Sequence, residues 1–164
     1  MDTFQLDDDI SGFVGGGNGV QKYLDDLKDF ETVIMGRKTY QFGYKYGLVP
    51  GKLAYPHMKH YIFSKSLSFD NPDEKLVVKD LDISEISKIR DDSNTDVYLC
   101  GGGVFSGWLL EHELIDILKL KVSPLLLGQG ISLFGDSTKS YSLNLIDTEE
   151  YEAGLLINTY EIAY

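Results

Sequence analysis

The hydrophobic positions of this 164-residue chain follow two different periods. Compact, largely apolar runs, the pattern of buried strands, lie at residues 32–35, 60–64, 75–79 and 96–100. Apolar positions spaced three and four residues apart, the pattern of helices, lie at residues 20–30, from about residue 37, at 82–90 and after residue 103. Strands that alternate with helices predict an α/β fold around a mostly parallel sheet.

The two ends of the chain follow other patterns. Residues 3–6 predict a short strand, and the glycine-rich residues 12–19 predict a mobile loop. Residues 117–123 alternate between apolar and lysine positions, as in a strand with one exposed face. Residues 141–147 and 155–164 predict an antiparallel pair that ends the sheet.

Two of the predicted helices carry an apolar stripe that we expect to face the core. In the helix at 82–90 the stripe consists of Ile83, Ile86 and Ile89. In the helix at 20–30 it consists of Val20, Tyr23, Leu24, Leu27 and Phe30. The acidic residues of that first helix lie away from its stripe, so we expect a solvated face at Asp25, Asp26 and Asp29.

Composition and charge limit the class of protein. Hydrophobic residues make up 43% of the chain, which supports one domain over residues 1–164 without a disulfide or metal. The lone Cys100 suits a reducing, cytoplasmic location. It is expected to be an inert packing residue unless the following helix start lowers its pKa. No apolar run is long enough to span a membrane, so we expect no transmembrane helix. The N-terminus has no basic region followed by a long apolar run, so we expect no signal peptide. The net charge of −11 disfavours nucleic-acid and membrane partners.

Two short units share the order of strand, glycine and helix start. Backbone N–H groups at such a turn point outward at the positive end of the helix dipole, which suits phosphate. Parallel strands also place ligands beyond their carboxyl ends. Taken alone, Gly101-Gly102-Gly103 can equally be a simple turn. Because two such units follow two core strands, we predict that both turns bind one dinucleotide. A G-x-G-x-x-G fingerprint is absent after the first strand, which argues against an ordinary Rossmann domain. The candidate residues are Gly36, Arg37, Lys38 and Thr39, and Gly101, Gly102, Gly103, Val104 and Phe105.

A third candidate follows the strand at 60–64. Ser64 and Lys65 stand where a cation could pair with a 2′-phosphate, which would favour NADPH over NADH. The alternative is an ordinary solvated lysine on a loop. His57, His60 and His112 are scattered without metal-ligand spacing, so we expect no metal site.

These stretches resemble a known family. Residues 32–40, with Gly36-Arg37-Lys38-Thr39, look like the signature stretch of dihydrofolate reductases and their relatives, and residues 96–103 resemble that family's strand ending in a glycine pair. Residues 114–116, 122–130 and 133–135 look like the reductase domain of riboflavin biosynthesis and its small stand-alone bacterial relatives. The resemblance covers nearly the whole chain.

The resemblance implies a fold, a cofactor and a reaction. The fold is a three-layer α-β-α domain with an eight-stranded sheet, often a homodimer. The activity is an NADPH-dependent reduction of a small pteridine-type or ribosylaminopyrimidine-type substrate. Phosphates would lie at Gly36–Thr39, the adenosine ribose near Ser64 and Lys65, and the pyrophosphate and nicotinamide near Gly101–Phe105. The turn containing Leu127 and Gly128 would lie at or near the pocket.

The chain departs from the family on the substrate side. Relatives commonly read Ser-x-Asp-Gly-Phe near the N-terminus, whereas here Asp9 and Ser11 have exchanged places and a usual tryptophan is missing. No proton donor is identified by the sequence, and Asp9 is an alternative to the acids of the first helix. A nucleotide-binding dimeric protein without reductase turnover therefore stands as the second hypothesis, and an interaction protein that binds no nucleotide as the third.

Overall fold

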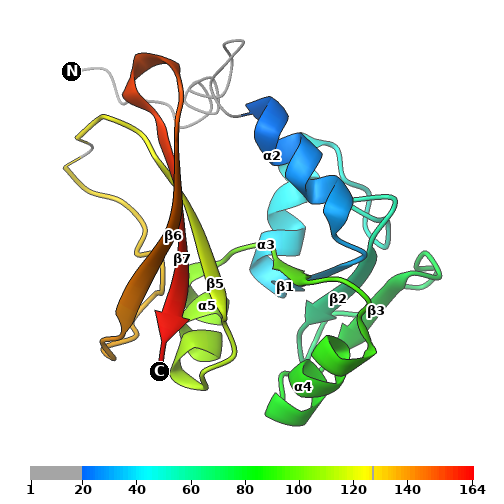
Figure 1. Ribbon diagram of the computed structural model, residues 1–164. Helices are drawn as coiled ribbons and strands as arrows, with labels where there is room; N and C mark the ends of the chain where they lie inside the picture. Colours follow the sequence, from blue (N-terminus) through cyan, green and yellow to red (C-terminus); the bar gives the residue numbers. More distant parts are fainter. Residues whose placement is uncertain (1–19, 127) are drawn as a thin grey trace. The chain divides into compact units, whose positions relative to one another are not determined.

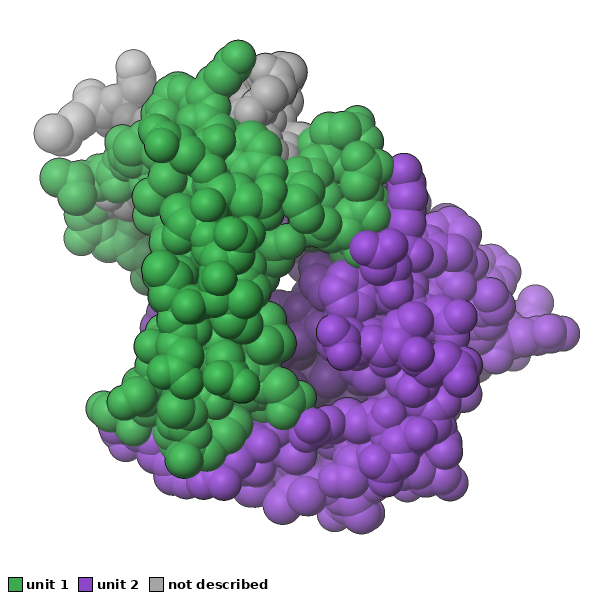
Figure 2. Space-filling view, in the orientation of Figure 1, with its two compact units in different colours: residues 1–27, 115–130, 140–164 green, residues 28–114, 131–139 purple. Residues whose placement is uncertain are grey.

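The structure, a computed structural model, describes residues 20–126 and 128–164 (Figure 1). The chain divides into two compact units, coloured separately in Figure 2. One consists of residues 28–114 and 131–139, and the other of residues 1–27, 115–130 and 140–164. The residues expected to form the first strand and the mobile loop lie outside the described part of the chain.

The unit formed by residues 28–114 and 131–139 is built on a parallel sheet. Its strands are β1 (Thr32–Gly36), β2 (Lys59–Phe63), β3 (Leu76–Lys79) and β4 (Val97–Leu99), in the order β3-β2-β1-β4. All three pairings are parallel, as the sequence predicts. Because β1 and β2 are each hydrogen-bonded on both sides, four of the five residues in each strand are buried.

Helices follow or connect these strands. They are α3 (Arg37–Phe42) with the short 3-10 turn η3 (Gly43–Tyr46), α4 (Ile83–Asp92) and α5 (Gly103–Glu111). Helix α4 begins where the Asp82 carboxylate accepts a hydrogen bond from the Ser84 N–H at 2.8 Å, a standard N-cap. Ile86 and Ile89 are buried as expected, but Ile83 is 46% exposed. It occupies the first helical position, before the turns that bury their isoleucines.

The other unit holds the antiparallel strands. They are β5 (Ile117–Val122), β6 (Ser142–Glu150) and β7 (Leu156–Ala163), in the order β5-β7-β6, and the 3-10 turn η4 (Glu152–Gly154) joins β6 to β7. The predicted C-terminal antiparallel pair is thus confirmed. A difference remains, because the described strands form one parallel and one antiparallel sheet instead of a single sheet.

The first predicted helix is correct in place, but only part of its predicted apolar stripe is buried. It consists of α2 (Val20–Asp26) and the turn η2 (Leu27–Asp29). Tyr23 and Leu24 are 38% and 48% exposed, whereas Leu27 is buried. Polar contacts form on another side of the helix, where Asp26 makes ion pairs with Lys22 and with Lys119 of β5. The apolar spacing was therefore a poor guide to the side that packs.

His60 is a fully buried polar residue that hydrogen bonds hold in one tautomer. Its Nε2 accepts a hydrogen bond from the Tyr55 N–H at 3.2 Å, so that nitrogen carries no proton. Nδ1 therefore carries the proton and donates it to the Met58 carbonyl oxygen at 3.0 Å. Burial lowers the pKa of His60, and the Met58 carbonyl only partly opposes that effect. The neutral ring is thus the form that the fold requires.

This environment predicts an acid-sensitive fold. A lowered pKa means that the unfolded chain binds the proton more readily, so the stabilisation is complete above the ordinary value of 6.5 and declines as the pH falls below it. We expect the free energy of unfolding in urea to fall between about pH 7.5 and pH 5.5, and to fall less in the variant His60→Gln. Equal pH dependence in both proteins would contradict this role.

Candidate functional site

The three turns singled out in the sequence follow adjacent parallel strands. Gly36 at the end of β1 pairs with Phe63 at the end of β2, and Ile34 of β1 pairs with Leu99 of β4. The Cys100 N–H continues the ladder by donating to the Ile34 carbonyl oxygen at 3.0 Å. The turns after β1, β2 and β4 therefore lie at the same carboxyl edge of one sheet.

The two glycine turns touch each other. The Thr39 hydroxyl donates a hydrogen bond to the Gly101 carbonyl oxygen at 3.3 Å. A Cβ atom on Gly102 would lie 2.6 Å from the Thr39 Oγ1, and one on Gly36 would lie 3.5 Å from the Cβ of Phe105. Residues that are 62 positions apart in the sequence thus form one continuous backbone surface.

The backbone conformation of the second turn favours glycine. Gly101 has a φ of 54° and Gly102, the N-cap of α5, a φ of 100°, and side chains disfavour both conformations. Neither Gly102 nor Gly36, the N-cap of α3, has a side chain that can cap its helix. A Cβ on Gly101 would meet no atom within 4 Å, so the backbone there borders open space. This arrangement suits an anion that approaches the backbone closely.

The charged residues of the first turn face solvent. Arg37 and Lys38 are exposed at the first positions of α3, whereas Thr39 is half-buried. In a chain with a net charge of −11, these two cations give the turn a local charge opposite to that of the whole molecule. An anionic ligand is therefore favoured at this edge and disfavoured over most of the remaining surface.

The turn after β2 is held by its own serine. The Ser64 N–H donates to the Lys79 carbonyl oxygen at 2.9 Å, and the Ser64 Oγ accepts from the N–H groups of Ser66 at 3.2 Å and Leu67 at 3.0 Å. A hydroxyl that accepts two hydrogen bonds retains its proton for donation. Lys65 is exposed beside it.

Phe105 and Val104 differ in exposure although both were candidates. Phe105 is buried and stacks on Phe63, with ring centroids 5.3 Å apart. Its side chain therefore fixes the first turn of α5 onto the end of β2. Val104 is 76% exposed, so its side chain faces solvent whereas that of Phe105 does not.

A segment that the sequence did not connect with this site packs on α5. The Ser106 Oγ donates to the Leu133 carbonyl oxygen at 2.8 Å. Cβ atoms on Gly103 and Gly107 would lie 2.5 Å from the Ser132 carbonyl oxygen and 2.3 Å from that of Phe134. Gly103, Ser106 and Gly107 therefore form a small-residue face that admits the backbone of 132–134. Ser106 and Gly107 follow Gly103 by three and four residues, a spacing that places small residues on one helix face and that could have indicated this contact from the sequence.

Asp26 is the most constrained of the acids considered as proton donors. Burial raises its pKa, but hydrogen bonds and charge interactions with Lys119 and Lys22 outweigh that effect, so the pKa is lowered. A carboxylate held ionised in this way is a poor acid at neutral pH. Asp25 and Asp29 are exposed, as expected for a solvated face.

Cys100 and His112 are structural. Burial raises the pKa of the Cys100 thiol, and hydrogen bonds with Tyr55 and Tyr98 only partly oppose that effect. The raised pKa argues against activation of this thiol by the helix start. His112 caps the end of α5, where its Nδ1 lies 2.8 Å from the Trp108 carbonyl oxygen and its ring stacks on the Trp108 indole at 4.1 Å.

The substrate-side candidates are described only in part. Asp9, Ser11 and Leu127 lie outside the described residues. Gly128 is exposed with a φ of 71°, and a Cβ there would meet nothing within 4 Å. Within the described residues, no three histidine, cysteine or acidic side chains gather as a metal site would require. In the same part of the chain no helix has the length and apolarity to cross a membrane.

The parallel sheet, its carboxyl-edge turns and the antiparallel C-terminal strands define an α/β protein of the dihydrofolate-reductase-like fold. The chain matches the family model of the RibD C-terminal domain over residues 11–157, and it belongs to that family. The family match and the similar structures indicate a family of proteins that resemble reductases.

Individual relatives agree with this assignment. The uncharacterized protein YyaP of Bacillus subtilis (strain 168) is 24% identical over 168 residues, covering 90% of this chain and 87% of the relative. A putative riboflavin biosynthesis protein from Shewanella sp. PV-4 is similar in structure, with a TM-score of 0.71, 22% identity, and coverage of 87% and 79%. Dihydrofolate reductase from Enterococcus faecalis, in complex with NADP(H), has a TM-score of 0.57, 17% identity, and coverage of 89% and 82%.

Proposed function

We propose that this protein is an NADPH-dependent reductase that transfers hydride to a small heterocycle of pteridine or ribosylaminopyrimidine type. The observation that carries the proposal is the hydrogen bond from Thr39 to the Gly101 carbonyl, which joins two glycine turns at one carboxyl edge. Support also comes from the family and from the similar fold of a dihydrofolate reductase in complex with NADP(H).

The residues at this edge fit such a cofactor. The open space beside the Gly101 backbone and the positive charge of the exposed Arg37 and Lys38 support a pyrophosphate site at this edge. Lys65 and the Ser64 hydroxyl are the groups proposed for the 2′-phosphate.

The chain's part in the reaction is mainly to bind and orient. The bound cofactor supplies the hydride, so the protein must hold the two reactants in the correct geometry. The ion pairs of Asp26 with Lys22 and Lys119 keep that carboxylate deprotonated. We therefore assign the proton to water or to a group outside the described residues, of which Asp9 is the candidate.

Arg37 gives the direct test of cofactor binding. Removing its guanidinium by Arg37→Ala is expected to weaken NADPH binding by about 1–3 kcal/mol, the range for a lost hydrogen bond to a charged group. Calorimetric titration with NADPH measures this loss. Lys45→Ala is the matched control, since Lys45 is an exposed cation of the same unit that lies over the Phe42 ring, 5.3 Å from its centroid. Unchanged affinity in Arg37→Ala would remove Arg37 from the proposed site.

A nucleotide-binding protein without turnover is the second candidate. The exchange of Asp9 and Ser11 relative to the family pattern and the ionised state of Asp26 favour it. A panel of pterins and ribosylated pyrimidines incubated with NADPH separates the two functions. Saturable cofactor binding with no oxidation by any acceptor supports the second candidate, whereas oxidation by one acceptor supports the reductase and names its substrate class.

We also propose a cytoplasmic homodimer formed by one face of the β5-β7-β6 sheet. Opposite residues in the antiparallel register share a face, so Leu118, Tyr160 and Leu145 form one row across the sheet. On this face of the three strands only Glu150 is charged, in a chain with a net charge of −11. Leu145 is 60% exposed. A broad uncharged face is typical of a protein interface.

Leu145→Asp tests the dimer. A carboxylate placed in an apolar interface loses its hydration without gaining a partner, so we expect the variant to be monomeric. Light scattering coupled to gel filtration measures the mass. Ser142→Asp is the control, because Ser142 points to the opposite face of the same strand, where it pairs with Ala163. A wild-type chain that is already monomeric would overturn this assignment.

A further inference from the structure

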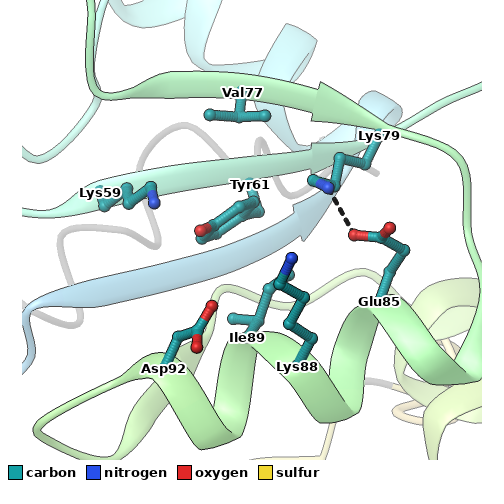
Figure 3. Close-up of a pocket in the computed structure, with 8 residues that line it drawn as sticks. All are labelled: Lys59, Tyr61, Val77, Lys79, Glu85, Lys88, Ile89 and Asp92. Carbon is teal, nitrogen blue, oxygen red and sulfur yellow. Dashed lines mark hydrogen bonds and ion pairs between the residues drawn. The ribbon is translucent and has the colours of Figure 1, made fainter.

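A cleft lies between α4 and the face of the parallel sheet formed by β2 and β3. It is bounded by α4 on one side and by β2 and β3 on the other (Figure 3), and its volume is about 230 Å³. Lys59 is the first residue of β2 and pairs with Thr32, the first residue of β1. The Lys59 end of the cleft is therefore about 13 Å along the strand from the carboxyl edge that carries the glycine turns.

Charged side chains gather in this cleft from three elements. Lys59 comes from β2, Lys79 from β3, and Glu85, Lys88 and Asp92 from α4. Lys79 and Glu85 neutralise each other through an ion pair of 2.5 Å, drawn as a dashed line in Figure 3. Two ammonium groups and one carboxylate remain, so the cleft carries net positive charge in a strongly acidic protein.

The remaining lysines have no carboxylate partner in the described part of the chain. Lys59 lies over the ring of Tyr61, with its Nζ 4.9 Å from the ring centroid. Lys88 reaches from α4 toward the strands in Figure 3. Among described residues neither ammonium group is within ion-pair distance of Asp92 or of another acid. Both ammonium groups belong to side chains that line the same hollow, so an anion bound there would be attracted by both.

The walls of the cleft strengthen its attraction for an anion. Tyr61 is only 7% exposed, and Val77 and Ile89 add apolar surface on the two sides. Charges beside such surface interact more strongly than charges in bulk water. The cleft is partly open to solvent, and its volume of about 230 Å³ leaves room for a phosphate group. Lysine is a common point-charge ligand for phosphate.

We propose that the cleft between α4 and strands β2 and β3 binds a small phosphate-bearing anion between Lys59 and Lys88, separately from the nucleotide edge. The ligand is either free phosphate or the phosphate group of a small ester, and Asp92 limits its total negative charge by repulsion. This site stands whether or not the protein is a reductase.

The test is an NMR titration of the full chain with inorganic phosphate and, in parallel, with glycerol phosphate. We expect saturable shifts at the amides of Lys59, Tyr61 and Lys88, and affinity reduced roughly tenfold or more in a Lys59→Met, Lys88→Met double variant. Lys45→Met is the matched control, because Lys45 also lies over an aromatic ring but outside the cleft. Tighter binding of one probe identifies the free ion or the ester as the ligand.

NADPH separates this proposal from the proposed function. The double variant should bind NADPH like the wild type, and Arg37→Ala should still bind phosphate in the cleft. Shifts confined to Gly36–Thr39 and Gly101–Gly103, or the absence of saturation in the wild type, would overturn the cleft site and leave the nucleotide site unaffected.

Discussion

Gly107→Ala is expected to destabilise the protein by about 2–3 kcal/mol, the upper part of the usual cost of overpacking. Alanine in place of glycine inside a helix ordinarily stabilises by about 1 kcal/mol, so the expected sign is the opposite of the helix propensity. The reason is tertiary: the new Cβ would lie 2.3 Å from the Phe134 carbonyl oxygen and 3.1 Å from its carbon. These are backbone atoms, which cannot move aside as a flexible side chain can.

Urea unfolding monitored by circular dichroism measures the effect. Gly130→Ala is the control, because a Cβ there would meet nothing within 4 Å, and a change below about 0.5 kcal/mol is expected. If Gly107→Ala were as stable as the wild type, the close packing of the 132–134 segment on α5 would be wrong. This packing supports the helix start that we assign to the cofactor.

Gly102→Val is expected to reduce NADPH affinity by about a hundredfold or more, which corresponds to roughly 2.8 kcal/mol. The φ of 100° is strained for any side chain, and a β-branched one suffers most. The added Cβ would also lie 2.6 Å from the Thr39 Oγ1, so the contact between the two turns must open. Both effects move the backbone groups that we assign to the diphosphate.

Gly101→Ala separates backbone strain from the clash. Its φ of 54° is also left-handed, but its Cβ would meet open space, so a milder loss of affinity is expected. Calorimetric titration with NADPH, accompanied by a thermal unfolding curve for each variant, distinguishes lost binding from lost folding. Wild-type affinity in a folded Gly102→Val protein would contradict the paired-turn site.

The alternation of strands and helices could be predicted because it depends on local order. The direction of the side chains repeats every two residues in a strand and about every 3.6 residues in a helix, so the apolar runs at β1 and β2 could be recognised as strands. Glycines at the ends of β1 and β4 likewise mark turns without any knowledge of the fold. The family resemblance then placed these turns in one architecture, and the match over residues 11–157 confirmed the family.

The choice of buried face could not be predicted in every helix. In α4, Ile86 and Ile89 are buried as expected because the sheet provides an apolar surface for them. In α2, Leu24 is exposed although it belongs to the apolar spacing. The contact that orients α2 joins Asp26 to Lys119, 93 residues away, and periodicity within one helix carries no information about such a partner.

By itself, then, the sequence determined the order of the elements, the places where glycine interrupts them and the family to which the chain belongs. These properties are local, or they survive in short stretches of residues. Only the tertiary structure decided that Thr39 meets Gly101, that the backbone at 132–134 packs on Gly107 and that His60 is held neutral. Each of these depends on the distance between groups and on their burial, which exist only once the chain has folded.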